Sequence, residues 1–242
     1  MKQEISVFST IEQTSNFDLV IGTHSGIFHL DEVVAISLLC IYYSTSKIAI
    51  IRSRNKEELY KCDILVDVGN GEFDHHQIGG NGKRTNNIPY ASAGLIWKEF
   101  GKKIICDLSE FTILHSQLPS IFEKIDKKFI QDVDAIDNGL PTTTTTFEYI
   151  SAFLPAWNNS NETTFNASFS EVVSITISIL EKLICKTIEE VYCFDLLTHS
   201  LQNNFSSILE IPAQTFPWNE TIIKFNSCNN NAIDFVIFKY PA

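Results

Sequence analysis

Short apolar segments that lack polar alternation constrain the fold of this chain more than any other feature. Three of them, Leu19–Gly22, Lys47–Arg52 and Asp63–Val68, have the length of β-strands. A strand with one exposed face alternates apolar and polar residues, whereas a strand of a parallel sheet is buried on both faces and does not. Two helical segments separate the strands: Asp31–Tyr43 is apolar almost all round, and Asn55–Cys62 is rich in helix-forming residues. This order predicts an α/β fold with a doubly wound parallel sheet.

Helices are predicted in three further segments. Ala91–Gly101 has a helical pattern and ends on a glycine. Pro119 begins the clearest helix, in which apolar residues recur at helical spacing until the stop signal Asn138-Gly139. In Ser170–Tyr192, serine and threonine alternate with isoleucine, which is typical of a strand, but the length of the segment and its later Glu and Lys residues favour a helix. We therefore predict a long helix there.

The last part of the chain has a different character. The β-branched run Thr142–Thr146 is not expected to be helical. Short strands and turns are expected from Phe205 to the apolar run Ile233–Phe238. The chain of 242 residues is long enough to bury a sizeable core without disulfide bridges. It is predicted to form two domains, residues 1–200 and residues 201–242.

Net charge limits the ligands that the surface can hold. The chain has 18 Lys and Arg against 29 Asp and Glu, a formal net charge of −11. A broad basic surface for nucleic acid is therefore excluded, and a phosphate-bearing substrate would need a local positive centre such as bound metal.

Three features bear on the compartment. The longest apolar run, Val33–Tyr43, is too short to span a bilayer. The six cysteines are scattered, and no targeting segment is visible in the first residues. These features predict a cytoplasmic protein with reduced thiols and no membrane partner, with the nucleus or mitochondrion as alternatives if the source is eukaryotic.

Metal-ligating side chains are concentrated after two of the predicted strands. Four of the six histidines lie in these two segments, together with several aspartates. The carboxyl ends of parallel strands share one edge of a sheet, where ligands of α/β proteins bind. The residues concerned are His24, His29 and Asp31 after the first strand, and Asp67, Asp74, His75 and His76 at and after the third.

A further carboxylate lies on the helix that Pro119 begins. Asp137 follows Val133 by four residues and so continues the apolar stripe of this helix at its C-terminal end. A buried carboxylate is unfavourable unless it is paired or binds a cation, and the helix dipole disfavours negative charge at this end. Asp134 flanks the same stripe and is the alternative for this role.

The donor set indicates the class of metal. Imidazole and carboxylate ligands without cysteine suit Mn²⁺, Mg²⁺ or Zn²⁺ and not a structural, cysteine-rich zinc site. Six such ligands exceed what one open site needs, whereas two cations about 3.5–4 Å apart, bridged by one carboxylate, would use them all. Taken singly, each residue also has an ordinary structural interpretation, as a loop histidine, a surface turn, a helix cap or the partner of a lysine.

Two segments near this site are weaker candidates. Gly79–Gly82, followed by Lys83 and Arg84, has the composition of a phosphate-contacting loop or of a plain flexible loop, and the second interpretation is favoured. The small residues Ala91–Gly94 open a helix, which suits either an anion at the helix N-terminus or tight packing.

Several motifs together resemble the melanocyte-proliferating-gene (Myg) family, a branch of the DHH phosphoesterase superfamily that also includes RecJ-like exonucleases and family II pyrophosphatases. The motifs are Thr23–Glu32, Cys62–Gly69 and Phe73–Gln77, extended by Ser92–Ile96, Asp132–Gly139, Leu154–Asn158 and Pro217–Asn219. The resemblance covers residues 18 to 240 and implies a DHH phosphoesterase-like fold, a dinuclear Mn²⁺-type centre and hydrolysis of phosphodiester bonds. Members of the family are described as 3′-to-5′ RNA exonucleases.

Roles for the site residues follow from the resemblance by position. Asp67 would bridge the two ions, His76 would contact the scissile phosphate, and Asp74 would orient His75. His29 stands where the wider superfamily has an aspartate. The implied metal ligands are His24, His29, Asp31, Asp67, His75 and Asp137.

The combined reasoning predicts a metal-dependent hydrolase. Its substrate would be RNA or a short oligonucleotide, degraded as by a 3′–5′ exonuclease, with metal-bound hydroxide as nucleophile and Mn²⁺ as the expected ion. Two alternatives stay open: a pyrophosphatase or dinucleotide phosphodiesterase that uses the same site, and a non-catalytic remnant that binds metal or a partner. Because family members continue into a second domain, residues 201–242 are expected to be a truncated part of it. The oligomeric state is not predicted.

Overall fold

A parallel sheet of four strands, in the order β1-β3-β2-β4, forms the framework of the N-terminal half. The computed structural model describes residues 4–113, 115–141, 146–202, 207–213, 215–228 and 233–238. The strands are β1 (Ile5–Phe8), β2 (Leu19–Thr23), β3 (Ile48–Arg52) and β4 (Ile64–Leu65). The predicted α/β class with a parallel sheet is confirmed, while the doubly wound, DHH-like arrangement stays a prediction.

Two strands differ from the sequence-based prediction. The prediction lacks β1, which pairs with β3 along its whole length. All four residues of β1 are half-buried, so its sequence carries no clear burial pattern. The strand predicted over Asp63–Val68 is shortened to β4, because the chain turns at Asp67, whose φ of 61° lies in the left-handed region.

Helix α1 (Leu30–Tyr42) lies at the centre of the core. All its residues up to Ile41 are buried, as its all-round apolar sequence predicts. It packs against α3 (Ser92–Leu108) and α7 (Glu162–Gln202). Helix α3 continues past Gly101, its predicted end, because this glycine packs against Trp97, where an added Cβ would come within 2.7 Å of the indole. The glycine therefore serves packing inside the helix and does not end it.

The helix predicted from Pro119 consists of three consecutive helical segments. They are α4 (Leu118–Ile125), the π-helical turn η2 (Asp126–Ile130) and α5 (Gln131–Asp137). The helix ends at the predicted stop, where Gly139 has a φ of 68° and its N–H donates to the Ile136 carbonyl. This stop places Asp137 in the last turn of α5.

Short elements complete the N-terminal half: α2 (Lys56–Leu59), η1 (Ile11–Thr14), α6 (Thr146–Ser151) and η3 (Trp157–Asn159). Helix α2 is shorter than the predicted segment Asn55–Cys62. Within the run predicted to be non-helical, residue 146 begins α6, and residues 142–145 lie outside the described residues.

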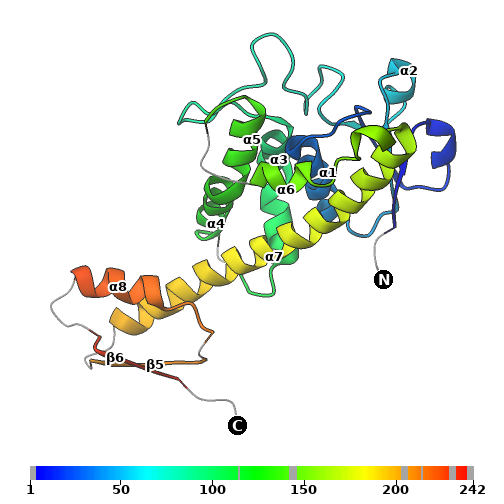
Figure 1. Ribbon diagram of the computed structural model, residues 1–242. Helices are drawn as coiled ribbons and strands as arrows, with labels where there is room; N and C mark the ends of the chain where they lie inside the picture. The colour runs from blue at the N-terminus through cyan, green and yellow to red at the C-terminus, as the bar shows by residue number, and fades with distance from the viewer. Residues whose placement is uncertain are drawn as a thin grey trace.

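Helix α7 leads from the main core to a second, smaller apolar cluster (Figure 1). It contains the predicted helix Ser170–Tyr192 and extends beyond it at both ends. In the cluster, the end of α7 meets β5 (Ile208–Ile211), which pairs in parallel with β6 (Phe235–Phe238). Helix α8 (Asn219–Cys228) lies where only short strands and turns were predicted, so that prediction is wrong for these residues. Ile222 on its inner face is buried in this cluster.

Two further predictions concern the whole chain. The division into residues 1–200 and 201–242 stays a prediction; α7 crosses that boundary and supplies Leu197 and Leu201 to the second cluster. Among the described residues, no helix combines the length and the apolarity that crossing a membrane requires.

Candidate metal centre

The loops that follow β2 and β4 meet at the carboxyl edge of the sheet. The two strands are parallel neighbours, so the residues that come directly after them lie side by side. His24 Nε2 is 3.4 Å from Asp67 Oδ2, and both side chains are almost fully buried. The left-handed backbone at Asp67 turns the chain out of the sheet at this position. The predicted convergence of these two segments is therefore present in the structure.

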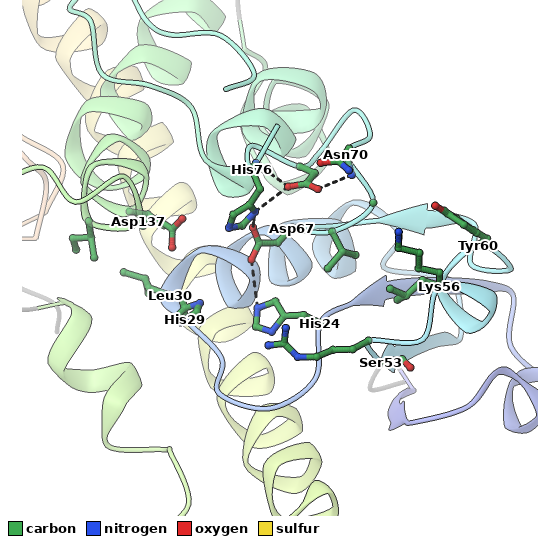
Figure 2. Close-up of a pocket in the computed structure, with 17 residues that line it drawn as sticks. His24, His29, Leu30, Ser53, Lys56, Tyr60, Asp67, Asn70, His76 and Asp137 are labelled. Atoms are coloured by element: carbon green, nitrogen blue, oxygen red, sulfur yellow. Dashed lines mark hydrogen bonds and ion pairs between the residues drawn. The ribbon is translucent and has the colours of Figure 1, made fainter. Parts of the chain in front are cut away.

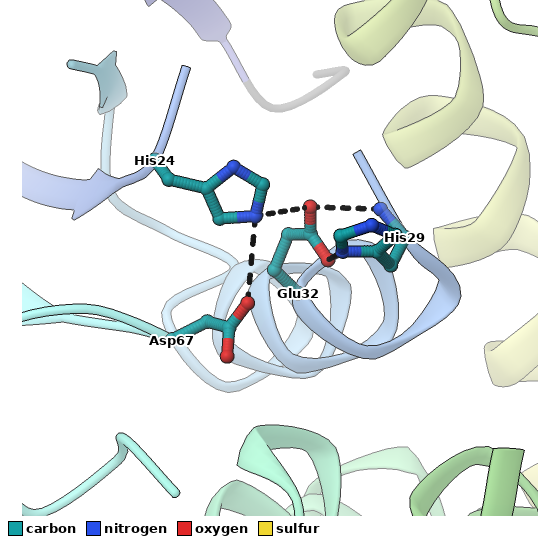
Figure 3. A group of neighbouring side chains, drawn as sticks. All are labelled: His24, His29, Glu32 and Asp67. Carbon is teal, nitrogen blue, oxygen red and sulfur yellow. Dashed lines mark hydrogen bonds and ion pairs between the residues drawn. The ribbon is translucent and has the colours of Figure 1, made fainter. Parts of the chain in front are cut away.

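A first group of potential ligands surrounds His24 (Figure 3). Its Nε2 lies 2.9 Å from Glu32 Oε1, and Glu32 is completely buried. His29 precedes α1 as its N-cap, and its N–H donates to Glu32 Oε1 over 2.8 Å. His29 Nδ1 lies 3.9 Å from Glu32 Oε2, which accepts no hydrogen bond from any described residue. Together with Asp67, these side chains present nitrogen and oxygen atoms within 4.8 Å of one another.

A second group surrounds His75. His75 Nε2 lies 2.8 Å from Asp137 Oδ2, 3.3 Å from Asp67 Oδ1 and 3.9 Å from Asp31 Oδ2. This nitrogen is buried, and the oxygens of three carboxylates surround it. Asp67 faces both groups, since Oδ2 is directed toward His24 and Oδ1 toward His75. Its carboxylate thus occupies the position of a bridge between them.

His76, like His29, is an exposed member of the cluster. Its Nδ1 lies 3.0 Å from Asp74 Oδ1 and 3.3 Å from Asp67 Oδ1. Asp74 is buried and also accepts hydrogen bonds from the backbone N–H groups of His76 and Asn70. The Asp74 carboxylate thus holds His76, and its expected role in orienting His75 stays a prediction.

The N-terminus of α3 binds the carboxylate of Asp31. The N–H groups of Ser92 and Ala93 donate to the two oxygens of Asp31 over 2.9 and 2.7 Å. Of the two interpretations of Ala91–Gly94, an anion at the helix N-terminus or tight packing, the first is present, and the anion is a side chain of the protein itself. These bonds fix the orientation of Asp31 toward His75.

Asp134 and Asp137 have different surroundings. Asp134 is completely buried, receives a hydrogen bond from Gly94 N–H over 2.9 Å and lies 2.5 Å from Arg84 Nη1. Arg84 also forms two hydrogen bonds with Asp126 and is itself buried, so it is not available to contact phosphate. Of the two aspartates, Asp137 is the one that lies beside His75.

Crowding of carboxylates shifts the protonation equilibria of the cluster. Burial opposes charge on the His24 and His75 rings, but their carboxylate neighbours outweigh it and raise the pKa of each to about 10. Burial acts to raise the pKa of Asp67, but the two imidazoles hold it below its usual range. Burial, followed by the charges of Asp67 and Asp137, raises the pKa of Asp31. This concentration of negative charge requires positive charge close by, from ring protons or from cations.

The donor atoms could hold a metal ion. Both groups consist of imidazole nitrogens and carboxylate oxygens, which suit Mn²⁺, Mg²⁺ or Zn²⁺. The buried Glu32 Oε2 lacks a hydrogen-bond partner among the described residues, as a ligand atom does before a cation binds. Glu32 is the residue that the sequence analysis missed. Its signal was a glutamate three residues after the N-cap of a buried helix.

The cluster lies on one wall of a cavity of about 660 Å³ (Figure 2). His24, Asp67, His76 and Asp137 line this cavity, together with residues of the segment between β3 and β4. A cavity of this size admits a small molecule or the end of a chain. Among the described residues, the site therefore has donor atoms, negative charge and access from outside.

The fold and the cluster define an α/β protein with a group of histidines and carboxylates that could hold a metal ion at the edge of a parallel sheet. Residues 20–241 match the profile of MYG1_exonuc, described as uncharacterised protein family UPF0160. The chain belongs to this family. The resemblance to the Myg family is thereby confirmed, while the wider DHH superfamily placement stays a prediction.

Relatives of the chain carry the same family name. The mouse and human proteins named MYG1 exonuclease are each 30% identical to it over 250 residues, covering 90% of the chain and 65% and 66% of the relatives. A MYG1 protein of Schizosaccharomyces pombe is 37% identical over 161 residues, 59% of the chain and 50% of the relative. The chain thus spans about two thirds or less of these relatives. No solved structure matches it.

Proposed function

We propose that the protein hydrolyses phosphodiester bonds of RNA or short oligonucleotides as a 3′–5′ exonuclease, with two divalent cations, Mn²⁺ foremost. The observation that carries the proposal is the position of Asp67, whose two carboxylate oxygens face two separate groups of ligands. The mouse and human relatives named MYG1 exonuclease support a nuclease. Placement in the DHH phosphoesterase superfamily belongs to the same proposal.

The two groups divide the ligands between the ions. One ion would be held by His24, His29 and Asp67, with Glu32 beside them. The other would be held by the second group and by the same bridging carboxylate; its members are Asp31, His75 and Asp137. When bound, such ions neutralise charge on a phosphoryl group and make a nucleophile available at neutral pH.

His76 and Asp74 would act on the substrate from the chain itself. Asp74 accepts hydrogen bonds from both the backbone and the ring Nδ1 of His76, so the ring has one orientation. The remaining nitrogen, Nε2, is the one left to meet a phosphate oxygen in the cavity that His76 lines. Asp74 is thus a positioning residue for His76.

The test uses purified protein with Mn²⁺ and RNA labelled at its 5′ end, where a 3′–5′ exonuclease produces a ladder of shortened labelled products. Asp67→Asn and His75→Asn should each reduce the rate at least about 100-fold, since each removes a proposed ligand of the ions. His115→Asn is the matched control, because His115 is exposed and belongs to neither ligand group. Undiminished activity of the Asp67 and His75 variants would refute the proposal.

A small substrate is the second candidate, favoured by the formal net charge of −11, which leaves little positive charge for a long polyanion. The same assay with pyrophosphate and with a dinucleotide separates this candidate from the first. Preferential turnover of pyrophosphate would identify a pyrophosphatase. Uptake of metal without turnover of any phosphoester would identify a non-catalytic, metal-binding protein.

A further inference from the structure

The wall of the cavity opposite Asp137 is formed by the segment Ser53–Tyr60. In Figure 2, Lys56 and Tyr60 lie on one side of His24 and Asp67, and Asp137 lies on the other. The sheet brings this segment to the metal centre, because Thr23 pairs with the last residue of β3 and Ser53 N–H donates to the Thr23 carbonyl over 2.9 Å. The segment therefore starts one residue away from the backbone of His24.

Two cations of this segment line the cavity without a charged partner. Arg54 and Lys56 are exposed, and neither side chain forms an ion pair or a hydrogen bond with any described residue. Elsewhere in this acidic chain, Lys47, Lys124 and Lys128 are paired with glutamates. Unpaired positive charge beside a cluster of carboxylates lowers the electrostatic barrier to an incoming anion.

Tyr60 adds an aromatic ring to the same wall. Its side chain is 67% exposed, although the preceding Leu59 is buried and anchors α2 to the core. The backbone of the segment is held by local bonds, since Asn55 accepts from Glu57 N–H over 2.9 Å and its own N–H donates to Ser53 Oγ. An exposed aromatic ring next to two cations is typical of a site for single-stranded nucleic acid. In such a site the bases stack on aromatic rings and the phosphates contact the positive charges.

We propose that Ser53–Tyr60 is a strand-binding subsite, in which Arg54 and Lys56 contact a backbone phosphate next to the scissile one and Tyr60 stacks on a base. The inference rests on the proposed function and deepens it. It assigns a single-stranded oligonucleotide as the substrate, because pyrophosphate has no base for Tyr60 to contact. The subsite adds affinity for the strand and leaves the reaction at the metal centre unchanged.

The test compares two substrates in the presence of Mn²⁺. Bis-p-nitrophenyl phosphate reports on the metal centre, and a single-stranded RNA or DNA hexamer reports on the centre and the subsite together. The double variant Arg54→Gln/Lys56→Gln should raise KM for the hexamer about tenfold and leave kcat/KM for the small ester within about twofold. The matched control is Lys61→Gln/Lys182→Gln, which removes two exposed cations that do not line the cavity.

Binding provides a readout that is independent of turnover. A fluorescein-labelled phosphorothioate hexamer, which resists hydrolysis, is titrated with protein at several salt concentrations. The slope of log affinity against log salt should fall by about 0.7 in the double variant, the value for one neutralised phosphate of a single strand. Tyr60→Ala should weaken binding about tenfold, whereas Tyr60→Phe keeps the ring and should bind as the wild type does.

The outcomes separate the two proposals. The subsite proposal would be overturned if the double variant had the KM and the salt slope of the wild type. It would also be overturned if kcat/KM fell equally for the hexamer and the small ester. Turnover of the small ester without turnover or binding of the hexamer would also overturn it, while the hydrolase would stand. If the wild type hydrolyses neither substrate, the proposed function fails and the titration still decides whether the strand binds at Arg54, Lys56 and Tyr60.

Discussion

The guanidinium of Arg84 lies buried between two acidic side chains of the helical segment Leu118–Asp137. It is 2.5 Å from Asp134 Oδ2 and forms hydrogen bonds of 2.6 and 2.8 Å with the two oxygens of Asp126. The Arg84 and Asp126 side chains are 6% and 14% exposed, and that of Asp134 is not exposed at all. Substitution of Arg84 by methionine retains much of the apolar stem but leaves both carboxylates without their cation.

The expected loss of stability follows from this burial. Removal of one partner of a buried, hydrogen-bonded ion pair costs about 3–5 kcal/mol, since the remaining charge stays desolvated. A domain is stable by only about 5–15 kcal/mol, so Arg84→Met should lower the free energy of unfolding by about a fifth or more. The exposed pair of Lys103 and Asp107 is the contrast, because solvent screens a surface ion pair and its contribution to stability is small.

The assay is urea unfolding at neutral pH, followed by circular dichroism and by tryptophan fluorescence. Arg84→Met is compared with Lys103→Met as the exposed control, and with Arg84→Met/Asp134→Asn. The double variant should recover part of the loss, because it removes one of the two uncompensated charges. A loss of unfolding free energy in Arg84→Met that is no larger than the loss in Lys103→Met would contradict this prediction. Burial of the ion pair would then contribute nothing to stability.

Two further predictions concern the surroundings of the site. Gly94→Ala places a Cβ onto the Asp134 carboxylate that Gly94 N–H binds, so it should destabilise the protein by about 1–3 kcal/mol in urea unfolding, whereas Gly71→Ala, with open space around its Cβ, should be nearly neutral. Mn²⁺ at 100 times its dissociation constant should stabilise the wild type by about 2.7 kcal/mol, seen as a higher melting temperature that chelation reverses. Asp67→Asn should lose this shift, and an equal shift in both proteins would argue against Asp67 as the shared ligand.

The regular elements were predictable where burial leaves a pattern in the sequence. The helix predicted over Asp31–Tyr43 is α1, because a helix surrounded by the core is apolar on every side. Elements stabilised mainly by their neighbours were not predictable. Strand β1 depends on its pairing with β3, and α8 depends on the burial of Ile222 in the second cluster. Gly101 was predicted to end its helix because glycine often does so. In the structure it lies inside α3, where Trp97 packs against it.

The sequence by itself determined that histidines and aspartates of two segments reach one edge of the sheet, because residues that directly follow parallel strands meet there in any fold of this class. Only the tertiary structure decided how those residues are used. Asp134 and Asp137 are three residues apart and share one side of a helix, so the pattern cannot separate them. The packing of Arg84 against Asp134 leaves Asp137 beside His75. Distances between residues far apart in the chain depend on how helices and loops pack, and packing is a property of the whole fold.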